Sequence, residues 1–214
     1  MRKLQEKYQN IQKNMIQQMP ESILNAFSQS LAQLIDLNLE AQALKVGDTA
    51  PDFTLPSSDG RLISLYNVLK ESKDNVILSF FRGNWCPFCV AELSHYQEAI
   101  NEKIIDTASI LAISPQTTEF NHIAAIQNNL QFNLLSDQGN KVAKEYGLVF
   151  TLQENIRDIY KELGADLELF NGDTSYQLPI PATYIIGKDR KIKFASVNTN
   201  YMERADICNI NNFK

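Results

Sequence analysis

The feature that most constrains this chain is a pair of cysteines at the junction between a buried strand and a helix. Residues 76–81, Val-Ile-Leu-Ser-Phe-Phe, are a nearly continuous apolar run of the kind expected of a central strand covered on both faces. Cys86 and Cys89 follow this run, and apolar residues then recur at helical spacing over residues 87–103. Unpaired backbone N–H groups and the positive end of the helix dipole meet at such a helix start and favour an anion. The pattern therefore predicts reactive thiols at this junction.

The spacing of the two cysteines allows them to react with each other. Cys89 lies three residues after Cys86, one turn away on the same helix face, so its sulfur can reach that of Cys86. Pro87 stands at the start of the helix, where its missing N–H does no harm. We therefore predict a dithiol that cycles with a disulfide, in which one cysteine attacks and the other resolves. On helix-terminus grounds we favour Cys86 as the more exposed and more acidic thiol.

Three neighbouring residues are candidates to support the cysteine pair. We expect Trp85 to cap the site with a flat apolar surface. Arg82 could add positive charge near the thiolate, although an ordinary solvated or salt-bridged arginine explains it equally well. Glu92 could relay protons to the buried thiol, but a carboxylate on the helix surface is the simpler interpretation.

Other roles for the cysteines require partners that the sequence does not supply nearby. A structural zinc site needs four ligands, and the remaining candidates, Cys208, His95 and His122, are isolated from one another, so we expect no metal. His95 is six residues beyond Cys89, about 600° around the helix, and should point away from the pair. We expect surface or packing roles for both histidines, and a bystander role for Cys208. Two inert buried cysteines remain the alternative to a reactive pair.

The first 44 residues are predicted to be a helical extension. Apolar residues recur there at spacings of three or four, namely Ile16, Met19, Ile23, Phe27, Leu31, Leu34 and Leu37. Pro20 marks an early boundary within the extension. The main domain is expected to follow over residues 45–214. The extension must lie either on that domain or on a second subunit, which leaves a homodimer open.

The main domain shows strands that alternate with helices and end in a hairpin. Strands are predicted at residues 53–55, 62–65, 76–81, 109–113, 132–135, 182–186 and 191–195. Helices are predicted at residues 87–103, 118–129, 141–146 and 152–163, with an irregular segment over 164–181 and a closing helix from 206 to 211. This order predicts an α/β domain with a central mixed sheet and helices on both faces.

Composition narrows the partners and the compartment. The formal net charge of −5 offers no electrostatic footprint for nucleic acid or an anionic membrane. No stretch approaches the roughly 20 apolar residues that span a bilayer, and the N-terminal residues lack the apolar core of a secretory signal. We therefore expect a cytoplasmic protein that needs no cofactor and binds neither nucleic acid nor membrane.

From Val46 onward the sequence resembles the alkyl hydroperoxide reductase/thiol-specific antioxidant (AhpC/TSA) superfamily, and within it the peroxiredoxin-like proteins that carry a CxxC. The matching segments are residues 46–55, 80–89, 92–93, 113–117, 135–137 and 178–184. The resemblance implies a thioredoxin-like three-layer fold and an antioxidant oxidoreductase that reduces hydroperoxides with a thioredoxin- or glutathione-type reductant. A thioredoxin-like protein disulfide oxidoreductase and a non-catalytic, redox-sensitive interaction module remain alternatives.

The resemblance also assigns positions within the site, with departures. Pro181 matches the proline that is cis in thioredoxins and faces the disulfide; a cis bond would leave the backbone of Ile180 free to pair with a substrate chain. Peroxiredoxins surround the attacking cysteine with a Pro-x-x-x-Thr/Ser-x-x-Cys motif and a later arginine. Here Cys89 takes the attacking position, Cys86 the Thr position and Arg82 the Pro position, and Pro181 stands about where the later arginine would be. A peroxiredoxin mode implies attack by Cys89; a thioredoxin mode implies attack by Cys86.

Overall fold

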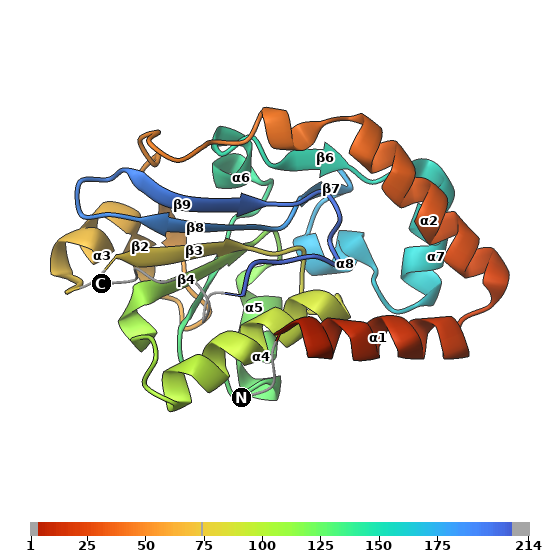
Figure 1. Cartoon of the computed structure of the whole chain (residues 1–214), viewed down its shortest axis with the longest axis horizontal. Helices are drawn as coiled ribbons and strands as arrows, with labels where there is room; N and C mark the ends of the chain where they lie inside the picture. The colour runs from red at the N-terminus through yellow and green to blue at the C-terminus, as the bar shows by residue number, and fades with distance from the viewer. Residues whose placement is uncertain (1–3, 74, 207–214) are drawn as a thin grey trace.

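The computed structural model describes residues 4–73 and 75–206 of the 214-residue chain (Figure 1). Its centre is a five-stranded mixed sheet in the order β5-β4-β3-β8-β9. The strands are β3 (Val76–Phe80), β4 (Ile110–Ser114), β5 (Asn133–Ser136), β8 (Ala182–Ile186) and β9 (Ile192–Val197). The β3, β4 and β5 strands run parallel, whereas β8 is antiparallel to both β3 and β9. The predicted mixed sheet, with the apolar run at its middle, is confirmed.

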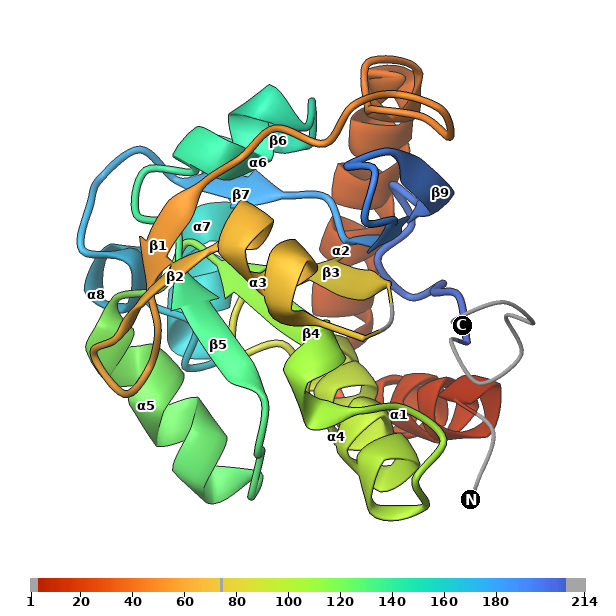
Figure 2. The same ribbon diagram turned by 90° about the vertical axis from the view of Figure 1, so that its left-hand side faces the viewer.

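Side chains of the central strand alternate between two apolar layers. Ile77 packs with α1 (Leu4–Gln18), α4 (Pro87–Asn101) and α5 (Thr118–Gln127) on one face of the sheet. Val76, Leu78 and Phe80 point to the other face, toward the elements α3 (Leu65–Glu71), α6 (Lys141–Glu145) and α7 (Glu154–Glu162). Figure 2 shows α4, α1 and α5 on one side of the sheet and α3 and α6 on the other. The fold is therefore the three-layer α/β arrangement that the order of elements predicts.

The N-terminal extension consists of two helices that lie on the main domain of the same chain. The α1 helix packs along α4, where the ring of Tyr8 meets Phe88 edge-on with centroids 5.6 Å apart. Helix α2 (Glu21–Asp36) follows the break at Pro20 and packs on α7, where Ser30 Oγ donates a hydrogen bond of 2.8 Å to Gln153 Oε1. Figure 1 shows the two helices meeting at an angle beside the end of the sheet. We call α1 and α2 together the arm.

Two short antiparallel strand pairs lie outside the central sheet. The predicted strands at 53–55 and 62–65 form the antiparallel pair β1 (Thr54–Pro56) and β2 (Leu62–Ser64). The segment 164–181, expected to be irregular, instead contains α8 (Leu167–Asn171) and β7 (Gln177–Pro179), and β7 pairs with β6 (Val149–Thr151). These elements are too short to show a period. Helix α8 is fixed by a local cap, in which Asp166 Oδ1 accepts from the Leu169 amide at 3.3 Å.

Some of the apolar residues that recur at helical spacing in and around the arm and α4 are exposed rather than buried. Ile16 and Leu37 are 67% and 53% exposed, and Ile104 is 45% exposed. Leu4 and Tyr8 are buried instead, in the apolar layer that α4 also lines. Within residues 4–73 and 75–206, none of the helices combines the length and apolar character that crossing a bilayer requires. The predicted closing helix and Cys208 lie outside the described residues.

Candidate active site

The site begins where β3 ends and α4 starts. Cys86 is the N-cap residue of α4 and Pro87 follows at its first turn, as the sequence predicts. The loop between strand and helix is held by two backbone bonds, from the Phe81 amide to the Ile113 carbonyl (2.9 Å) and from the Cys86 amide to the Gly83 carbonyl (3.1 Å). This loop fixes where the cysteines lie relative to the sheet.

A close approach of Trp85 and Gln116 to the backbone makes Gly83 necessary in this loop. A Cβ at residue 83 would overlap Trp85 Nε1 and would lie 2.9 Å from Gln116 Oε1. The same Gln116 oxygen accepts a hydrogen bond of 2.8 Å from the Asn84 amide. A residue with a Cβ at this position would therefore force the side chains of Trp85 and Gln116 to shift.

The two cysteines are both thiols, they hydrogen-bond to each other, and both are fully buried. The expectation that Cys86 is the more exposed thiol is therefore wrong. It failed because the sequence cannot show that the arm and the segment after β9 cover the helix start. We call that segment, residues 198–206, the tail.

Arg82 lies beside the cysteine pair, with its guanidinium against one sulfur. Its Nη2 atom donates a hydrogen bond of 3.0 Å to Cys86 Sγ, and Nη1 donates one of 3.2 Å to the hydroxyl of Tyr160. The guanidinium carbon lies 3.9 Å from the ring centroid of Tyr201 and 5.2 Å from that of Trp85. Arg82 is only 4% exposed, so its charge acts in a medium of low polarity.

The side chain of a second arginine, Arg204, is also buried and contacts the other cysteine. Its Nη2 atom lies 3.5 Å from Cys89 Sγ, and Nη1 forms a short ion pair with Glu92 Oε2. Glu92 Oε1 also accepts a hydrogen bond of 2.9 Å from the Tyr96 hydroxyl. Sequence reasoning missed Arg204, because it lies in an irregular segment 115 residues from Cys89. It also placed Glu92 on the helix surface, whereas Glu92 is 1% exposed; its distant partner Arg204 is what permits this burial.

The surroundings act in opposite directions on the two thiols. Burial raises the pKa of Cys86, and its hydrogen bond to Cys89 raises it further, against the charge of Arg82. Burial also works to raise the pKa of Cys89, but the hydrogen bond from Cys86 and the charges of Arg204 and Arg82 outweigh it, so this pKa is lowered. Of the two thiols, Cys89 therefore has the lower pKa, the reverse of the acidity order favoured from helix position.

The segment around Pro181 does not adopt the geometry of an open substrate groove. Among the described residues no peptide bond is cis, so the bond between Ile180 and Pro181 is trans. The Ile180 amide donates a hydrogen bond of 2.8 Å to the Leu148 carbonyl, and Ile180 is fully buried. A substrate chain could pair with the backbone of Ile180 only if the Pro181 bond were cis and the Ile180 amide were free, and neither is the case here.

The histidines lie apart from the sulfurs. His95 is buried, with Nε2 2.8 Å from Asp206 Oδ1 of the tail, and His122 Nδ1 lies 3.1 Å from the Ser58 carbonyl oxygen. The packing role expected of His95 is confirmed. Over the part of the chain that the structure describes, no three His, Cys, Asp or Glu side chains gather in a way that could hold a metal ion.

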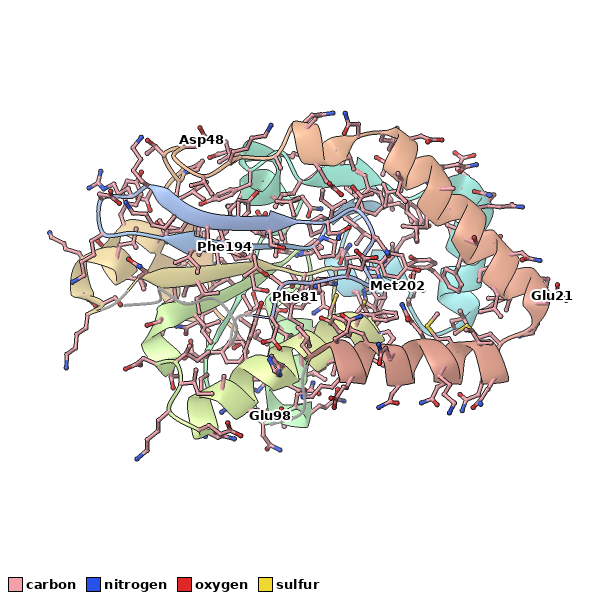
Figure 3. The ribbon with its side chains drawn as sticks, viewed as in Figure 1. Glu21, Asp48, Phe81, Glu98, Phe194 and Met202 are labelled. Carbon is pink, nitrogen blue, oxygen red and sulfur yellow. The ribbon has the colours of Figure 1, made fainter. Side chains whose placement is uncertain are left out.

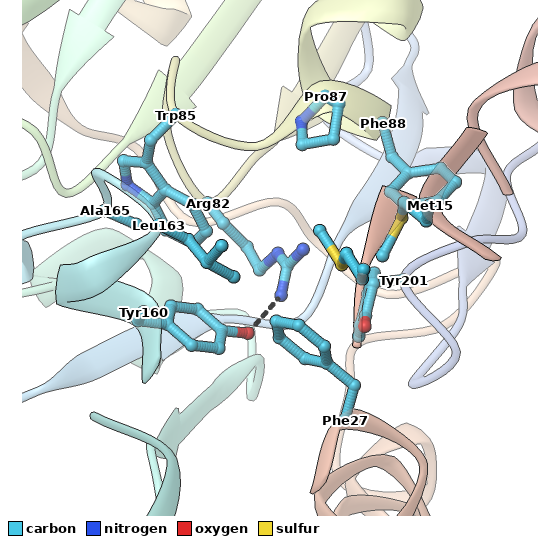
Figure 4. A pocket seen from close by; sticks show the side chains of 11 residues that line it. Met15, Phe27, Arg82, Trp85, Pro87, Phe88, Tyr160, Leu163, Ala165 and Tyr201 are labelled. Carbon is cyan, nitrogen blue, oxygen red and sulfur yellow. Dashed lines mark hydrogen bonds between the residues drawn. The ribbon is translucent and has the colours of Figure 1, made fainter. Parts of the chain in front are cut away.

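A pocket of about 350 Å³ lies beside Arg82 and the residues that flank Cys86 (Figure 4). Trp85, Pro87 and Phe88, which flank Cys86, form one wall, and the guanidinium of Arg82 reaches into the space. The arm supplies Met15, Met19 and Phe27, while Tyr160, Leu163, Ala165 and Tyr201 complete the lining. Trp85, which we expected to cap the site, forms part of one wall of this pocket, and Arg82 supplies a charged group to its lining.

Comparison with known proteins gives a consistent set of relatives. A sequence model described as the AhpC/TSA family matches residues 46–195. A Coxiella burnetii protein named "Putative peroxiredoxin bcp" is 33% identical over 107 residues, which cover 50% of this chain and 69% of that protein. The chloroplastic peroxiredoxin Q of Sedum lineare is 31% identical over 124 residues, which cover 58% of this chain and 64% of that protein.

Among solved structures, the crystal structure of peroxidoxin BcpB from Mycobacterium tuberculosis superposes with a TM-score of 0.57. It is 24% identical in sequence, and the match covers 74% of this chain and 89% of that one. At this identity the likeness supports the fold. Arm helix α1 and the tail both lie outside the family match, although both contact the cysteine pair or its pocket.

Proposed function

Because this chain belongs to the AhpC/TSA family, we propose that it is a peroxiredoxin-like thiol oxidoreductase whose Cys86/Cys89 dithiol reduces hydroperoxides. The catalytic domain in this proposal is residues 45–214, and residues 1–44 are a helical extension that shapes access to it. The observation that carries the proposal is a buried pair of thiols, each sulfur contacted by a different buried guanidinium.

This arrangement suits the chemistry of O–O cleavage. A thiolate attacks one peroxide oxygen, so that an S–O bond forms, the O–O bond breaks, and the departing alkoxide or hydroxide takes a proton. The cysteine becomes a sulfenic acid. The second thiol then attacks that sulfur, releases water and forms the Cys86–Cys89 disulfide. Donors aimed at the developing oxyanion, as Arg82 and Arg204 are placed to be, stabilise the charge as the bond breaks.

The shape of the site favours a small oxidant over a protein disulfide. The pocket of about 350 Å³ is the size of a small-molecule site and leads to Arg82 and the residues around Cys86. A folded protein could bring a disulfide to these fully buried sulfurs only after the arm or the tail had moved, whereas a small molecule fits the pocket as it stands. The trans bond at Pro181 and the paired amide of Ile180 likewise disfavour the thioredoxin-like alternative.

Turnover requires a reductant, which we propose to be a dithiol protein of the thioredoxin type or a glutathione-dependent donor. It supplies two electrons and two protons to the Cys86–Cys89 disulfide and leaves as its own disulfide. A protein donor can reach the buried sulfurs only when the arm or the tail moves.

The test is a measurement on a Cys208→Ser protein, so that only the two site thiols react. After reduction, it is mixed with hydrogen peroxide or an organic hydroperoxide, and loss of thiol, disulfide mass and peroxide consumption are followed. We expect one disulfide per peroxide consumed and a second-order rate well above that of a small free thiol. A rate equal to that of the free thiol would remove the peroxidase proposal; thiols that never pair would instead support the non-catalytic module.

A further inference from the structure

The tail brings a charged side chain to Cys89 from outside the part of the chain that matches the family. It leaves the end of β9 at Val197 and crosses from the sheet toward α1 and α4, and Met202 marks it in Figure 3. At the position where the family resemblance implies an arginine, this chain has Pro181, which has no charge. Arg204 lies 23 residues later in the sequence, and its Nη2 atom is 3.5 Å from Cys89 Sγ.

The position of Arg204 is fixed by several contacts rather than by one. Its Nε and Nη2 atoms donate hydrogen bonds of 3.3 Å and 3.2 Å to the Tyr201 carbonyl, and Nη1 pairs with Glu92. The ring of Tyr201 stacks on Arg82 and meets Phe88 with centroids 5.8 Å apart. Two residues beyond Arg204, Asp206 contacts the buried ring of His95. The tail is thus held on α4 on both sides of Arg204.

We propose that Arg204 is a catalytic residue of this site, whose guanidinium holds the Cys89 sulfur as the thiolate, and that Glu92 is the residue that positions it. The catalytic meaning of this assignment rests on the proposed function, which it deepens by naming Cys89 as the attacking thiol. Cys86, which donates its hydrogen bond to Cys89, is then the resolving thiol. In this assignment Cys89 is the attacking thiol, as the family resemblance implies. The arginine beside it is Arg204 of the tail, because Pro181 stands about where the family has its arginine.

The opposite charges of Arg204 and Glu92 give the pair a signature that packing alone would not give. The charged and titratable groups that interact with Cys89 come from five segments: Arg204 of the tail, Arg82 of the β3–α4 loop, Cys86 and Glu92 at the N-cap and in the first turns of α4, Tyr8 of α1 and Tyr160 of α7. Arg204 favours the thiolate, whereas a negative charge on Glu92 disfavours it, so removing each should move the thiol in opposite directions. A side chain that only filled space would not give this pair of opposite signs.

The experiment uses the full chain with Cys86→Ser and Cys208→Ser, so that Cys89 is the single thiol. The rate of alkylation by iodoacetamide, measured from pH 4 to pH 10, gives the pH midpoint at which Cys89 ionises. We expect Arg204→Met to raise this midpoint by about 1–3 pH units, the effect of removing an opposite charge within 4–6 Å. Arg204→Lys keeps the charge, so its pH midpoint should lie between that of Arg204→Met and that of the protein with Cys89 as its single thiol. Glu92→Gln, which keeps an oxygen for the arginine to bind, should lower the midpoint.

The matched control is Arg190→Met. Arg190 also stacks on a tyrosine ring, that of Tyr66 at 4.0 Å, but lies at the turn between β8 and β9, away from the site. If Arg204→Met moves the midpoint no further than Arg190→Met does, the proposal fails. If Arg204→Met does not fold, the other two variants decide: a midpoint that rises in Glu92→Gln, or that rises in Arg204→Lys by more than about 3 units, overturns it.

The alkylation assay contains no peroxide, so its outcome is separate from that of the proposed function. A wild-type protein that ignores hydroperoxides would remove the peroxidase proposal and leave the Arg204–Cys89 interaction standing. Conversely, an active peroxidase whose Cys89 titrates identically without Arg204 would keep the function and remove this residue from it. The rate with hydrogen peroxide in the Arg204 variants, measured with Cys86 restored, then shows how much of turnover depends on Arg204.

Discussion

The guanidinium of Arg82 donates to the sulfur of Cys86 at 3.0 Å from a position four residues earlier in the chain. The β3–α4 loop bends so that both side chains lie beneath the arm, with Tyr160 and Tyr201 on the other sides of the guanidinium. The family motif has a proline at the position of Arg82, so this contact replaces a rigid loop residue with a charge. The site therefore contains one guanidinium for each sulfur.

The first prediction concerns Arg82. Arg82→Met keeps most of the side-chain volume but removes a charge that lowers the pKa of Cys89, together with the hydrogen bond to Cys86. A hydrogen bond to a charged group contributes about 1.5–3 kcal/mol, and each 1.4 kcal/mol is tenfold in rate, so the rate with hydrogen peroxide at pH 7 should fall about 10- to 100-fold. Stopped-flow measurement of thiol loss gives the rate. Arg61→Met, which removes a surface-exposed arginine, is the control and should leave it unchanged; an equal loss in both variants would contradict a specific role.

The second prediction concerns pH. Because the pKa of Cys89 is lowered well below that of an ordinary thiol, we expect the thiolate to be the main form near neutral pH, so that raising the pH adds little to the rate. An ordinary thiol of pKa about 8.5 reacts about fivefold faster at pH 8.5 than at pH 7.5. The reduced Cys208→Ser protein should change by less than twofold over the same interval and lose rate only at acid pH, as the lowered pKa is crossed. A fivefold rise with peroxide over that interval would show that the thiol is not perturbed.

The sequence predicts correctly those parts of the site that depend on interactions between residues close together in the chain. Cys86, Pro87 and Cys89 could be placed at a helix start because strand, turn and helix follow one another within a few residues. The continuous apolar run likewise predicts a central strand, since only such a strand is covered on both faces.

The rest depends on contacts between distant segments. Glu92 is charged and in a helix, so the usual rule places it in solvent; its partner Arg204 is 112 residues away and has no periodic pattern around it. Tyr8 sits in a polar helix whose apolar stripe continues into exposed positions, and its burial depends on Phe88 of α4. The arm and the tail, which cover the cysteines, are far apart in the sequence, and no local pattern indicates that they meet. The exposure of Cys86 was predicted wrongly for this reason.

The third prediction tests how the arm is attached. Tyr8→Ala removes a buried ring from the contact between α1 and α4. Loss of a large buried aromatic side chain lowers the free energy of unfolding by about 3–5 kcal/mol, and by less if α1 can detach without the rest of the domain unfolding. We expect a lower midpoint in urea unfolding and faster reaction of both cysteines with a bulky maleimide. Tyr8→Phe keeps the ring and should behave like the wild type. Ile16→Ala, on the same helix but at an exposed position, should change stability by less than about 0.5 kcal/mol.

The fourth prediction uses Trp85, the single tryptophan of the chain, as a reporter of the β3–α4 loop. A methyl group at residue 83 would overlap the indole and approach Gln116, so Gly83→Ala must displace Trp85 from the wall of the pocket. We expect its fluorescence emission to shift to longer wavelength as the ring meets more water, and the rate with peroxide to fall because Arg82 and Cys86 lie on the same loop. Gly60→Ala also places alanine at a positive φ (+85°), but in open space, and should leave both signals unchanged. Unaltered emission in Gly83→Ala would mean that the loop yields without moving the indole, and that this wall of the pocket is less rigid than the packing around Gly83 implies.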